Sequence, residues 1–316
     1  MILMTIILLL GFLYYMLFYS NFAKFSGSSL FTNFAASLMG NRSVCMDKSN
    51  MRVLLVGIDY RAGDYLYGLA DVIRFAEVDF ENQTINMIAI PRDLIVEIPL
   101  DRFKVPGPYK VNQAYFFGTP GMENYYGEGN GADSLNEVLE YNFGISADYY
   151  MVVNFQAFVS LIDALGGVDV DLPEPVYGGK QGDFPQGLQS LSGERALALA
   201  RIRENYSDEF RVLNQSLIIH GIFEKLLQPA TLIKSPVLIA QFQNSILTNF
   251  PADQIGNFAL CFQNFDRDNL ITHQVPSEYL RLENLYLTSL NEWTYGYRWD
   301  GRLIEWINIS LTSAKE

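Results

Sequence analysis

Arginine, aspartate and glutamine side chains stand in this sequence just after apolar runs and along one predicted helix. Arginine presents a planar fork of donors that can hold two phosphate oxygens at once. Aspartate oxygens bind Mg²⁺, which neutralises charge on phosphate during phosphoryl transfer. Several arginines that converge with two or three aspartates therefore predict a pyrophosphate site. The set comprises Asp59, Arg61, Asp71, Arg92, Asp93, Arg201, Arg203, Asp208, Arg211 and Gln215.

Each member of this set also has a simpler explanation. An Arg-Asp pair at a strand end is usually a surface ion pair, and Asp208 alone would be a helix N-cap. In an extended chain, however, Arg201 and Arg203 would point to one face. Asp208, Arg211 and Gln215 have helical spacing and would share one face of a helix. Their joint occurrence is what favours a functional interpretation.

An α/β architecture is predicted for the elements that carry these groups. The pattern predicts strands at residues 52–58, 72–80, 84–90, 149–153 and 168–172, an extended segment at 200–203, and helices at 134–142, 156–165 and 208–227. Strand–helix–strand spacing implies a sandwich whose sheet is at least partly parallel. Binding sites on open α/β sheets lie at strand ends, where these charges stand.

Local signals set the expected helix boundaries. Ser134 and Glu137 have the spacing of a capping box, and Asn154 is a good N-cap. Gly166 and Gly167 would end the helix that Asn154 begins. A glycine-rich loop is predicted at 118–131, and its end, residues 127–131, is predicted to be a mobile lid or loop beside the site.

Composition excludes several classes of function. The formal net charge of −13 gives no general attraction for nucleic acid, so any phosphate site must rest on a local arginine cluster. The two histidines, His220 and His273, are far apart in sequence, and no Cys-x-x-Cys motif occurs, which argues against zinc. Cys45 and Cys261 could form a disulfide in an exported domain or stay reduced and buried. We expect His220 to be a packed residue.

The amino end has the character of a membrane anchor. Residues 1–23 contain no charged side chain, and that length reaches the roughly 20 residues that span a bilayer. An uncleaved anchor is preferred to a signal peptide because a basic start and a small-residue cleavage site are poorly formed. No Lys or Arg precedes Lys24, so orientation cannot be read from flanking charge. Residues 24–50 are predicted to be a linker.

Nine short stretches together resemble one family. They include Ile-Pro-Arg92-Asp93 and Lys110-Val-Asn112, and they are residues 53–61, 70–72, 88–93, 110–115, 148–155, 161–168, 191–197, 200–203 and 207–215. Their order is that of the LytR–CpsA–Psr (LCP) proteins, which the chain resembles over roughly residues 52 to 226.

The resemblance implies an extracytoplasmic phosphotransferase anchored in the cell membrane by an N-terminal helix. Members move glycopolymers from an undecaprenyl-type pyrophosphate carrier to peptidoglycan or another wall acceptor and form a phosphodiester. The implied fold is a three-layer-like α/β sandwich with a central mixed sheet, which encloses the polyprenyl tail. The expected organisation is an anchor at 1–23, a linker at 24–50, a catalytic domain at 51–226 and a continuation packed on it at 227–316.

The resemblance also assigns roles to residues. Asp59 and Asp71 would hold Mg²⁺ or Mn²⁺. Pyrophosphate would be bound by Arg61, Arg92, Lys110, Arg201, Arg203, Arg211 and Gln215. Arg92, Asp93 and Asp208 are the expected catalytic residues, with either aspartate as a possible base. Many members carry arginine where this chain has Leu69 and Asn214. The loss of these two arginines would weaken pyrophosphate binding or change its geometry.

Three alternatives stay open or are argued against. The chain could be a weakly active or inactive polyprenyl-phosphate-binding protein, or a pyrophosphatase that uses water as acceptor. A transcriptional regulator is disfavoured by the anchor, the acidic balance and the lack of a basic DNA-reading helix. In the C-terminal part, core packing is expected for Trp293, Tyr295, Tyr297 and Trp299, with sugar contact as the alternative.

Overall fold

The computed structural model describes residues 49–60, 68–104, 107–203, 207–228, 231, 245–251, 261–262, 264–287 and 291–313. The predicted anchor at 1–23, Cys45 and Arg61 lie outside these ranges. Within them, no helix is long and apolar enough to cross a membrane. Cys261 is disulfide-bonded, and Cys45 is the only other cysteine in the sequence.

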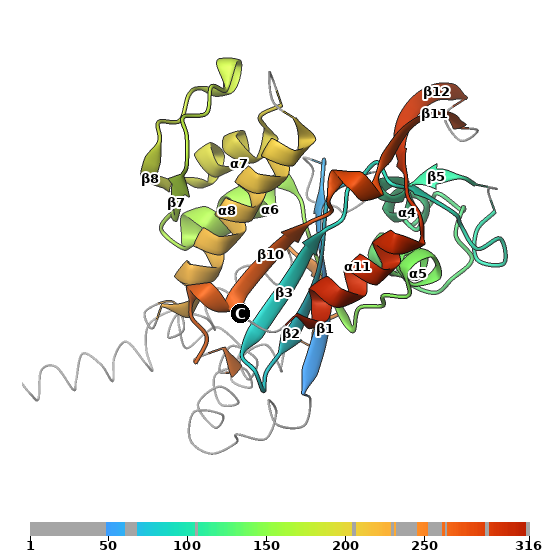
Figure 1. Cartoon of the computed structure of the whole chain (residues 1–316), viewed down its shortest axis with the longest axis horizontal. Helices are drawn as coiled ribbons and strands as arrows, with labels where there is room; N and C mark the ends of the chain where they lie inside the picture. Colours follow the sequence, from blue (N-terminus) through green and yellow to red (C-terminus); the bar gives the residue numbers. More distant parts are fainter. Residues whose placement is uncertain are drawn as a thin grey trace, which may run out of the picture.

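A six-stranded mixed sheet forms the centre of the molecule (Figure 1). Its strand order is β10-β3-β2-β1-β6-β9. The strands are β1 Asn50–Ile58, β2 Ala70–Asp79, β3 Thr84–Ala89, β6 Tyr149–Val153, β9 Leu247–Thr248 and β10 Leu270–Gln274. β1 pairs antiparallel with β2 and parallel with β6, and β10 pairs parallel with β3. The predicted 72–80 and 84–90 hairpin and the partly parallel sheet are confirmed.

Helices cover both faces of the sheet (Figure 1). On one face lie α4 Val111–Phe117, α5 Gly131–Phe143 and α11 Gly301–Thr312; on the other lie α6 Phe155–Ala164, α7 Gly193–Arg201 and α8 Asp208–Leu227. Successive side chains of a strand point to opposite faces of the sheet, so each strand contributes apolar residues to both helical layers. Leu54 and Phe75 pack against the first group, whereas Ala76 and Val78 face Ile219 and other residues of α8. Both faces of the sheet are therefore buried.

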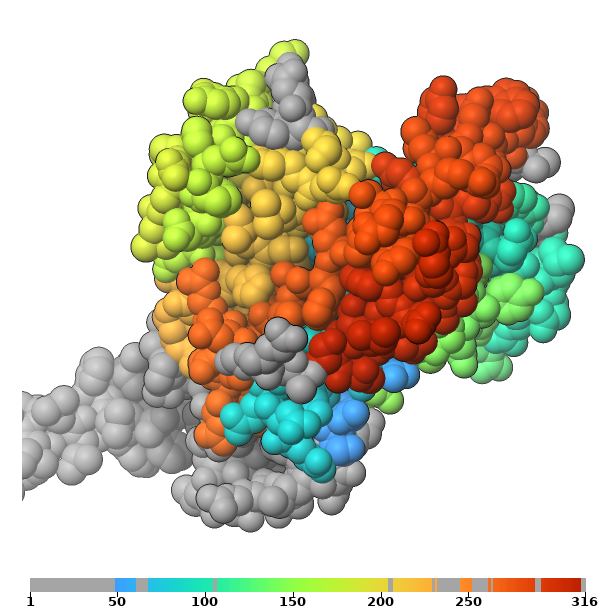
Figure 2. Space-filling view, in the orientation of Figure 1, coloured from blue at the N-terminus to red at the C-terminus, as the bar shows by residue number. Residues whose placement is uncertain are grey.

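Smaller elements complete the fold. Two-stranded sheets pair β4 Ile95–Val96 with β5 Tyr109–Lys110, β7 Val168–Leu172 with β8 Gly187–Leu191, and β11 Arg281–Leu287 with β12 Glu292–Arg298. Short 3-10 turns occupy Gly179–Gln181, Arg267–Asn269 and Ser277–Tyr279. Figure 2 shows the β11–β12 hairpin standing out on one side of a recess, with the lobe of β7 and β8 on the other.

Of the four aromatic residues at 293, 295, 297 and 299, two are packed in the core and two are exposed. Trp299 donates its indole N–H to the carbonyl of Ile95 at 2.7 Å, and its ring packs on Phe143. Tyr297 also packs against the core. Trp293 and Tyr295 are 68% and 63% exposed, so core packing is wrong for these two. They alternate along β12 with residues that face the body of the protein, which is why only part of the run is buried.

The predicted start of the helix at 134 is wrong. Helix α5 begins at Gly131, and Asn130 is its N-cap: the Asn130 side chain accepts from Ala132 N, and Asp133 accepts from Asn130 N at 2.8 Å. Asparagine is as good a cap as serine. The Ser134 hydroxyl instead donates to the buried carbonyl of Ala114.

Two further local predictions differ from the structure. The segment at 200–203 is not a strand, because α7 continues to Arg201 through alternating alanine and leucine, which are strong helix formers. Arg201 and Arg203 therefore do not share a strand face. Helix α8 is capped by Ser207, which accepts from Phe210 N at 3.2 Å, so Asp208 is the first helical residue and not the cap. The Asn154 cap is confirmed, and Gly166 and Gly167 at positive φ follow the helix it begins.

Candidate functional site

A cavity of about 570 Å³ opens where β1 and β3 end and β2 begins. The wall is completed by the starts of α4 and α6, the end of α7, the start of α8 and the hairpin β11–β12. The charged residues that line it are Asp59, Asp71, Arg92, Asp93, Lys110, Arg201, Arg203, Arg211 and Glu292. Cations outnumber carboxylates on this wall although the whole chain is strongly acidic. This is the local reversal of charge that an anion site requires in such a protein.

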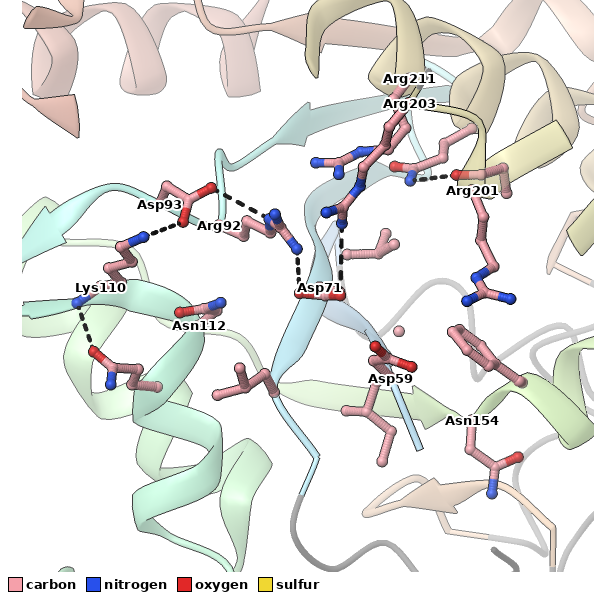
Figure 3. A pocket seen from close by; sticks show the side chains of 18 of the residues that line it. Asp59, Asp71, Arg92, Asp93, Lys110, Asn112, Asn154, Arg201, Arg203 and Arg211 are labelled. Atoms are coloured by element: carbon pink, nitrogen blue, oxygen red, sulfur yellow. Dashed lines mark hydrogen bonds and ion pairs between the residues drawn. The ribbon is translucent and has the colours of Figure 1, made fainter. Parts of the chain in front are cut away.

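A continuous chain of ion pairs crosses the cavity wall (Figure 3). Asp71 Oδ1 accepts from Arg92 Nη1 at 2.7 Å, and Asp93 Oδ2 accepts from Arg92 Nε at 3.2 Å. Lys110 Nζ donates to Asp93 Oδ1 at 2.9 Å. The Arg92 side chain is 19% exposed, so these bonds are shielded from solvent. Arg92 is thus fixed in orientation from both sides.

Pro91 explains why Arg92 and Asp93 stand here. Strand β3 ends at Ala89, and the proline that follows the next residue cannot donate to a sheet ladder. The chain leaves the sheet, and the next two side chains turn into the cavity. Burial disfavours the charge on Arg92, but the carboxylates of Asp71 and Asp93 outweigh burial and raise the pKa of Arg92. Its positive charge is therefore secured at any physiological pH.

Arg201 and Arg203 reach the same cavity in different ways. Arg203 follows α7, and its Nη2 lies 3.9 Å from Asp71 Oδ2, on the side of Asp71 opposite Arg92. Arg201 is the last residue of α7, and its guanidinium lies over the ring of Phe155 with 4.6 Å to the ring centroid. An aromatic face holds a cation without neutralising it. Arg201 thus keeps its full charge available to an anion.

Helix α8 contributes Arg211 and Gln215. Arg211 Nη2 lies 3.2 Å from Asp208 Oδ1, one turn earlier, so the predicted common face of this helix is confirmed for that pair. Burial lowers the pKa of Arg211, Asp208 opposes that shift, and the nearby Arg203 and Arg92 lower it further. Asp208 does not line the cavity, and its side chain is 44% exposed. Its contact is with the arginine and not with the space where a ligand would sit.

One arginine of the region was missed from the sequence. Arg74 lies on β2, is 3% exposed, and donates from Nη2 to the carbonyl of Val212 and to Gln215 Oε1, both at 3.2 Å. Gln215 Nε2 in turn donates to the carbonyl of Ala200 at 3.2 Å. The sequence offered a signal in Arg74 itself, a charge in the middle of a run that predicts a buried strand.

The oxygen groups on the wall fit a divalent metal. Asp59 and Asp71 both face the cavity, as does Asn112, whose buried Oδ1 has no hydrogen-bond partner among the described residues. Carboxylate and amide oxygens are the ligands that Mg²⁺ takes, and Mg²⁺ is commonly held by one or two carboxylates plus substrate phosphate. No group of three or more His, Cys, Asp or Glu side chains suited to a metal occurs within the described ranges. The fit is therefore to a metal that a phosphate ligand would help to hold.

Most of the predicted site is brought together. Of the expected residues, all but Arg61, which is outside the described ranges, and Asp208 line the cavity. No residue of the loop at 118–131 lines the cavity, and the end of this loop leads into α5, whose N-cap is Asn130. Leu69 lines the wall, whereas Asn214 is buried. The lining residues that were not expected include Asn112, Asn154, Phe155, Glu292 and Thr294.

Comparisons with known proteins agree with one another. A model of the LytR_cpsA_psr family matches residues 23–298. The polyisoprenyl-teichoic acid–peptidoglycan teichoic acid transferase TagU of Bacillus licheniformis is 28% identical over 76% of this chain and 72% of its own length. TagV of Bacillus subtilis, a transferase with the same enzyme name, is 28% identical over 67% of this chain and 53% of its own length. The regulatory protein MsrR of Staphylococcus aureus is 27% identical over 66% of this chain and 59% of its own length.

A solved structure extends the agreement to the fold. The crystal structure of Bacillus subtilis TagV superposes with a TM-score of 0.65 at 25% identity, covering 84% of this chain and 96% of that one. The mixed sheet and its two helical layers are thus shared, and the family model spans well over half of the sequence. The chain belongs to the LytR–CpsA–Psr family.

Proposed function

We propose that this protein transfers a glycopolymer from a polyprenyl-pyrophosphate carrier to peptidoglycan or another cell-wall acceptor and forms a phosphodiester. The transfer takes place on the outer side of the cytoplasmic membrane, to which residues 1–23 tether the enzyme. Its class as a phosphotransferase follows from the family and from the names of TagU and TagV. The donor, the acceptor and the location are part of the proposal.

The observation that carries the proposal is the fixed arginine in a cationic cavity. Arg92 is held by Asp71 and Asp93, and the guanidinium groups of Arg203 and Arg211 lie near the carboxylate of Asp71. A pyrophosphate diester carries two negative charges on adjacent phosphates, and bidentate guanidinium groups match its oxygens. Such groups are already oriented before the substrate arrives, so little reorganisation is needed in the transition state.

The proposed reaction is an in-line displacement at phosphorus. A hydroxyl oxygen of the acceptor attacks the phosphorus nearest the sugar, and the bond from that phosphorus to the bridging oxygen breaks. Polyprenyl phosphate leaves with the bond's electron pair, and the hydroxyl proton passes to solvent or to the leaving phosphate. Arg92, Arg203 and Arg211 stabilise the charge that develops on the equatorial and leaving oxygens. Phosphoryl transfer of this kind depends mainly on positioning and charge.

The three aspartates of the cavity wall have different tasks in this scheme. Asp93 accepts from both Arg92 and Lys110, which makes it a holder of cations and a weak candidate for a base. Asp59 and Asp71, with Asn112, would hold Mg²⁺ or Mn²⁺, which supplies charge neutralisation at the phosphate when bound. The protein's own residues bind, orient and shield the pyrophosphate.

The test of the proposal is transfer by purified protein from a synthetic lipid-linked donor. Wild-type protein should release polyprenyl phosphate and move the glycan to a peptidoglycan fragment. Arg92→Ala should reduce turnover by about 10²-fold or more, the range found when a fixed donor to a transition state is removed. Circular dichroism would check that the variant is folded, and Arg102→Ala is the matched control because Arg102 pairs with Glu137 away from the cavity.

The products separate this reaction from the alternatives. Release of polyprenyl phosphate with free glycan phosphate would identify a pyrophosphatase, in which water replaces the acceptor hydroxyl. Binding of the donor without any product would identify a lipid-holding protein. Near-normal transfer by folded Arg92→Ala would remove that residue from the mechanism.

A further inference from the structure

Two buried guanidinium groups lie near the first turns of α8, and of these Arg211 lines the cavity whereas Arg74 does not. Arg74 is 3% exposed and Arg211 is 6% exposed, and both guanidinium groups approach the first turns of α8. Arg211 pairs with Asp208, but no carboxylate pairs with Arg74 among the residues that the structure describes. A buried cation without a counter-ion opposes folding. The burial of Arg74 therefore calls for an explanation other than packing.

Hydrogen-bond donors exceed acceptors at this place. Arg74 Nε, Arg211 Nε, Arg211 Nη1 and Asn214 Nδ2 are buried and have no hydrogen-bond acceptor within the described part of the chain. Buried N–H groups are almost always satisfied in proteins, and each unsatisfied one costs free energy. A cluster of such donors therefore points to an anionic ligand.

Electrostatics support the same conclusion. Burial and, to a smaller extent, the positive charge of Arg211 together lower the pKa of Arg74 to about 10, so the two cations repel each other. Arg74 remains protonated at neutral pH because that pKa lies well above 7. An anion near both guanidinium groups would offset the repulsion and strengthen its own binding, since charges interact strongly where water is excluded.

The position of Arg74 determines how it can act. It does not line the cavity, but its Nη2 donates to Gln215, which does. On the same face of β2, further from the cavity, Ala76 and Val78 belong to an apolar layer that Ile219 of α8 covers. Arg74 thus stands between the cationic cavity and apolar packing. From there it orients Gln215, and its charge adds positive potential near Arg211.

We propose that Arg74 is a positioning residue for the substrate anion: it orients Gln215 and raises the affinity of Arg211 for a phosphate of a pyrophosphate ligand. This inference rests on the proposed function and assigns a role to a residue outside the cavity wall. It also explains the buried Asn214 on α8, because a second guanidinium on that helix would add to the charge that Arg74 already supplies from the sheet.

Binding to probes with and without charge tests the proposal. Arg74→Met should weaken the binding of inorganic pyrophosphate and of farnesyl pyrophosphate by about tenfold or more. Hydrogen bonds to charged groups are stronger than those between neutral groups. Affinity for farnesol, which has no charge, should not change. Arg74→Lys keeps the charge and should retain most of the affinity, whereas Arg74→Gln should behave like Arg74→Met. In the transfer assay, KM for the donor should rise more than kcat falls.

Thermal unfolding separates this role from a structural one. Without ligand, the Tm of Arg74→Met should be unchanged or higher, because apolar replacement of a buried charge is often neutral or stabilising. Arg52→Met is the matched control on the neighbouring strand: it breaks a 3.0 Å ion pair with the 7% exposed Glu77, so it should lower Tm and leave pyrophosphate affinity intact. A fall in Tm for Arg74→Met as large as for Arg52→Met would overturn the proposal.

The outcomes distinguish this inference from the function on which it rests. Wild-type affinity in folded Arg74→Met, together with lost affinity in Arg92→Ala, overturns the role of Arg74 alone. Failure of wild-type protein to bind either pyrophosphate overturns both. Weaker binding of both pyrophosphates by Arg74→Met at unchanged Tm, with partial recovery in Arg74→Lys, supports the assignment.

Discussion

At the scale of residues, the contact between Asp71 and Arg92 has two opposing effects on anion binding. Asp71 pairs with Arg92 at 2.7 Å and lies 3.9 Å from Arg203, so its carboxylate holds two cations in place. The same carboxylate reduces the charge that an anion would feel. A metal bound at Asp71 would compete with those arginines and release them toward phosphate. The ion pairs therefore position the arginines and need not persist when substrate is bound.

Metal dependence is a prediction at this scale. Treatment with EDTA should reduce transfer by at least about tenfold, and added Mg²⁺ should restore it, because the metal neutralises charge on phosphate. Asp59→Asn should raise the Mg²⁺ concentration needed for half-maximal rate, since an amide is a weaker ligand than a carboxylate. Asp101→Asn, at an exposed position outside the cavity, is the matched control. A rate that EDTA does not change would exclude a metal requirement.

At the scale of elements, short segments fix the direction of the charged side chains. Arg92 and Asp93 depend on the proline that ends β3, and Arg201 and Arg203 depend on where α7 ends. A single residue of helix more or less would rotate Arg201 away from Phe155, because each helical residue turns the side chain by about 100°. Helix boundaries are therefore functional properties of this site.

The corrected start of α5 yields a stability prediction. Asn130→Ala removes a cap that accepts from Ala132 N and also a donor to the Tyr150 hydroxyl at 2.7 Å. Loss of an N-cap costs about 1 kcal/mol. The free energy of unfolding from denaturant titration should fall by that amount or somewhat more. Glu140→Ala, at an exposed position of the same helix, should have little effect. Equal stability of Asn130→Ala and wild type would contradict the assigned cap.

At the scale of the whole molecule, an acidic protein keeps a cationic site by concentrating its arginines at one edge of the sheet. The chain has a formal net charge of −13, yet most of the charged residues on the cavity wall are basic. Overall charge would repel a free polyanion, so local contacts must supply the affinity. Salt should therefore affect binding less than it does in broadly basic phosphate-binding proteins.

Stability of the whole molecule should depend on pH through two histidines. Burial lowers the pKa of His220 and of His273 below the ordinary value of 6.5. The unfolded chain then binds more protons than the folded one as pH falls through that value, so the free energy of unfolding should decrease from pH 7.5 to pH 5.5. Each unit of pKa difference corresponds to about 1.4 kcal/mol.

Denaturant titrations at several pH values would measure this slope. The double variant His220→Gln, His273→Gln should show a smaller loss of stability between pH 7.5 and pH 5.5 than wild type. Between pH 7.5 and pH 8.5 both proteins should change little, because the histidines are neutral in the folded and unfolded states. If the free energy of unfolding falls equally with pH in both proteins, groups other than these histidines control the loss of stability at low pH.

The sequence by itself determined most elements of the central sheet and which residue types gather at their ends. Apolar alternation and short-range signals predicted the β2–β3 hairpin, the strand at 149–153 and the Asn154 cap, since these depend on neighbours in the chain. The motif at Arg92 and Asp93 was likewise readable, because proline ends a strand wherever it stands.

Only the tertiary structure decided the partners of each charge. The placing of Arg203 beside Asp71 and of Arg201 over Phe155 depends on how α6 and α7 pack on the sheet and against each other. Arg74 is the clearest case. In sequence it is a charge in an apolar run, and only the packing of α8 over β2 buries it and brings it beneath Arg211. Long-range packing of this kind leaves no periodic signal in the chain, so it could not be predicted from residue spacing.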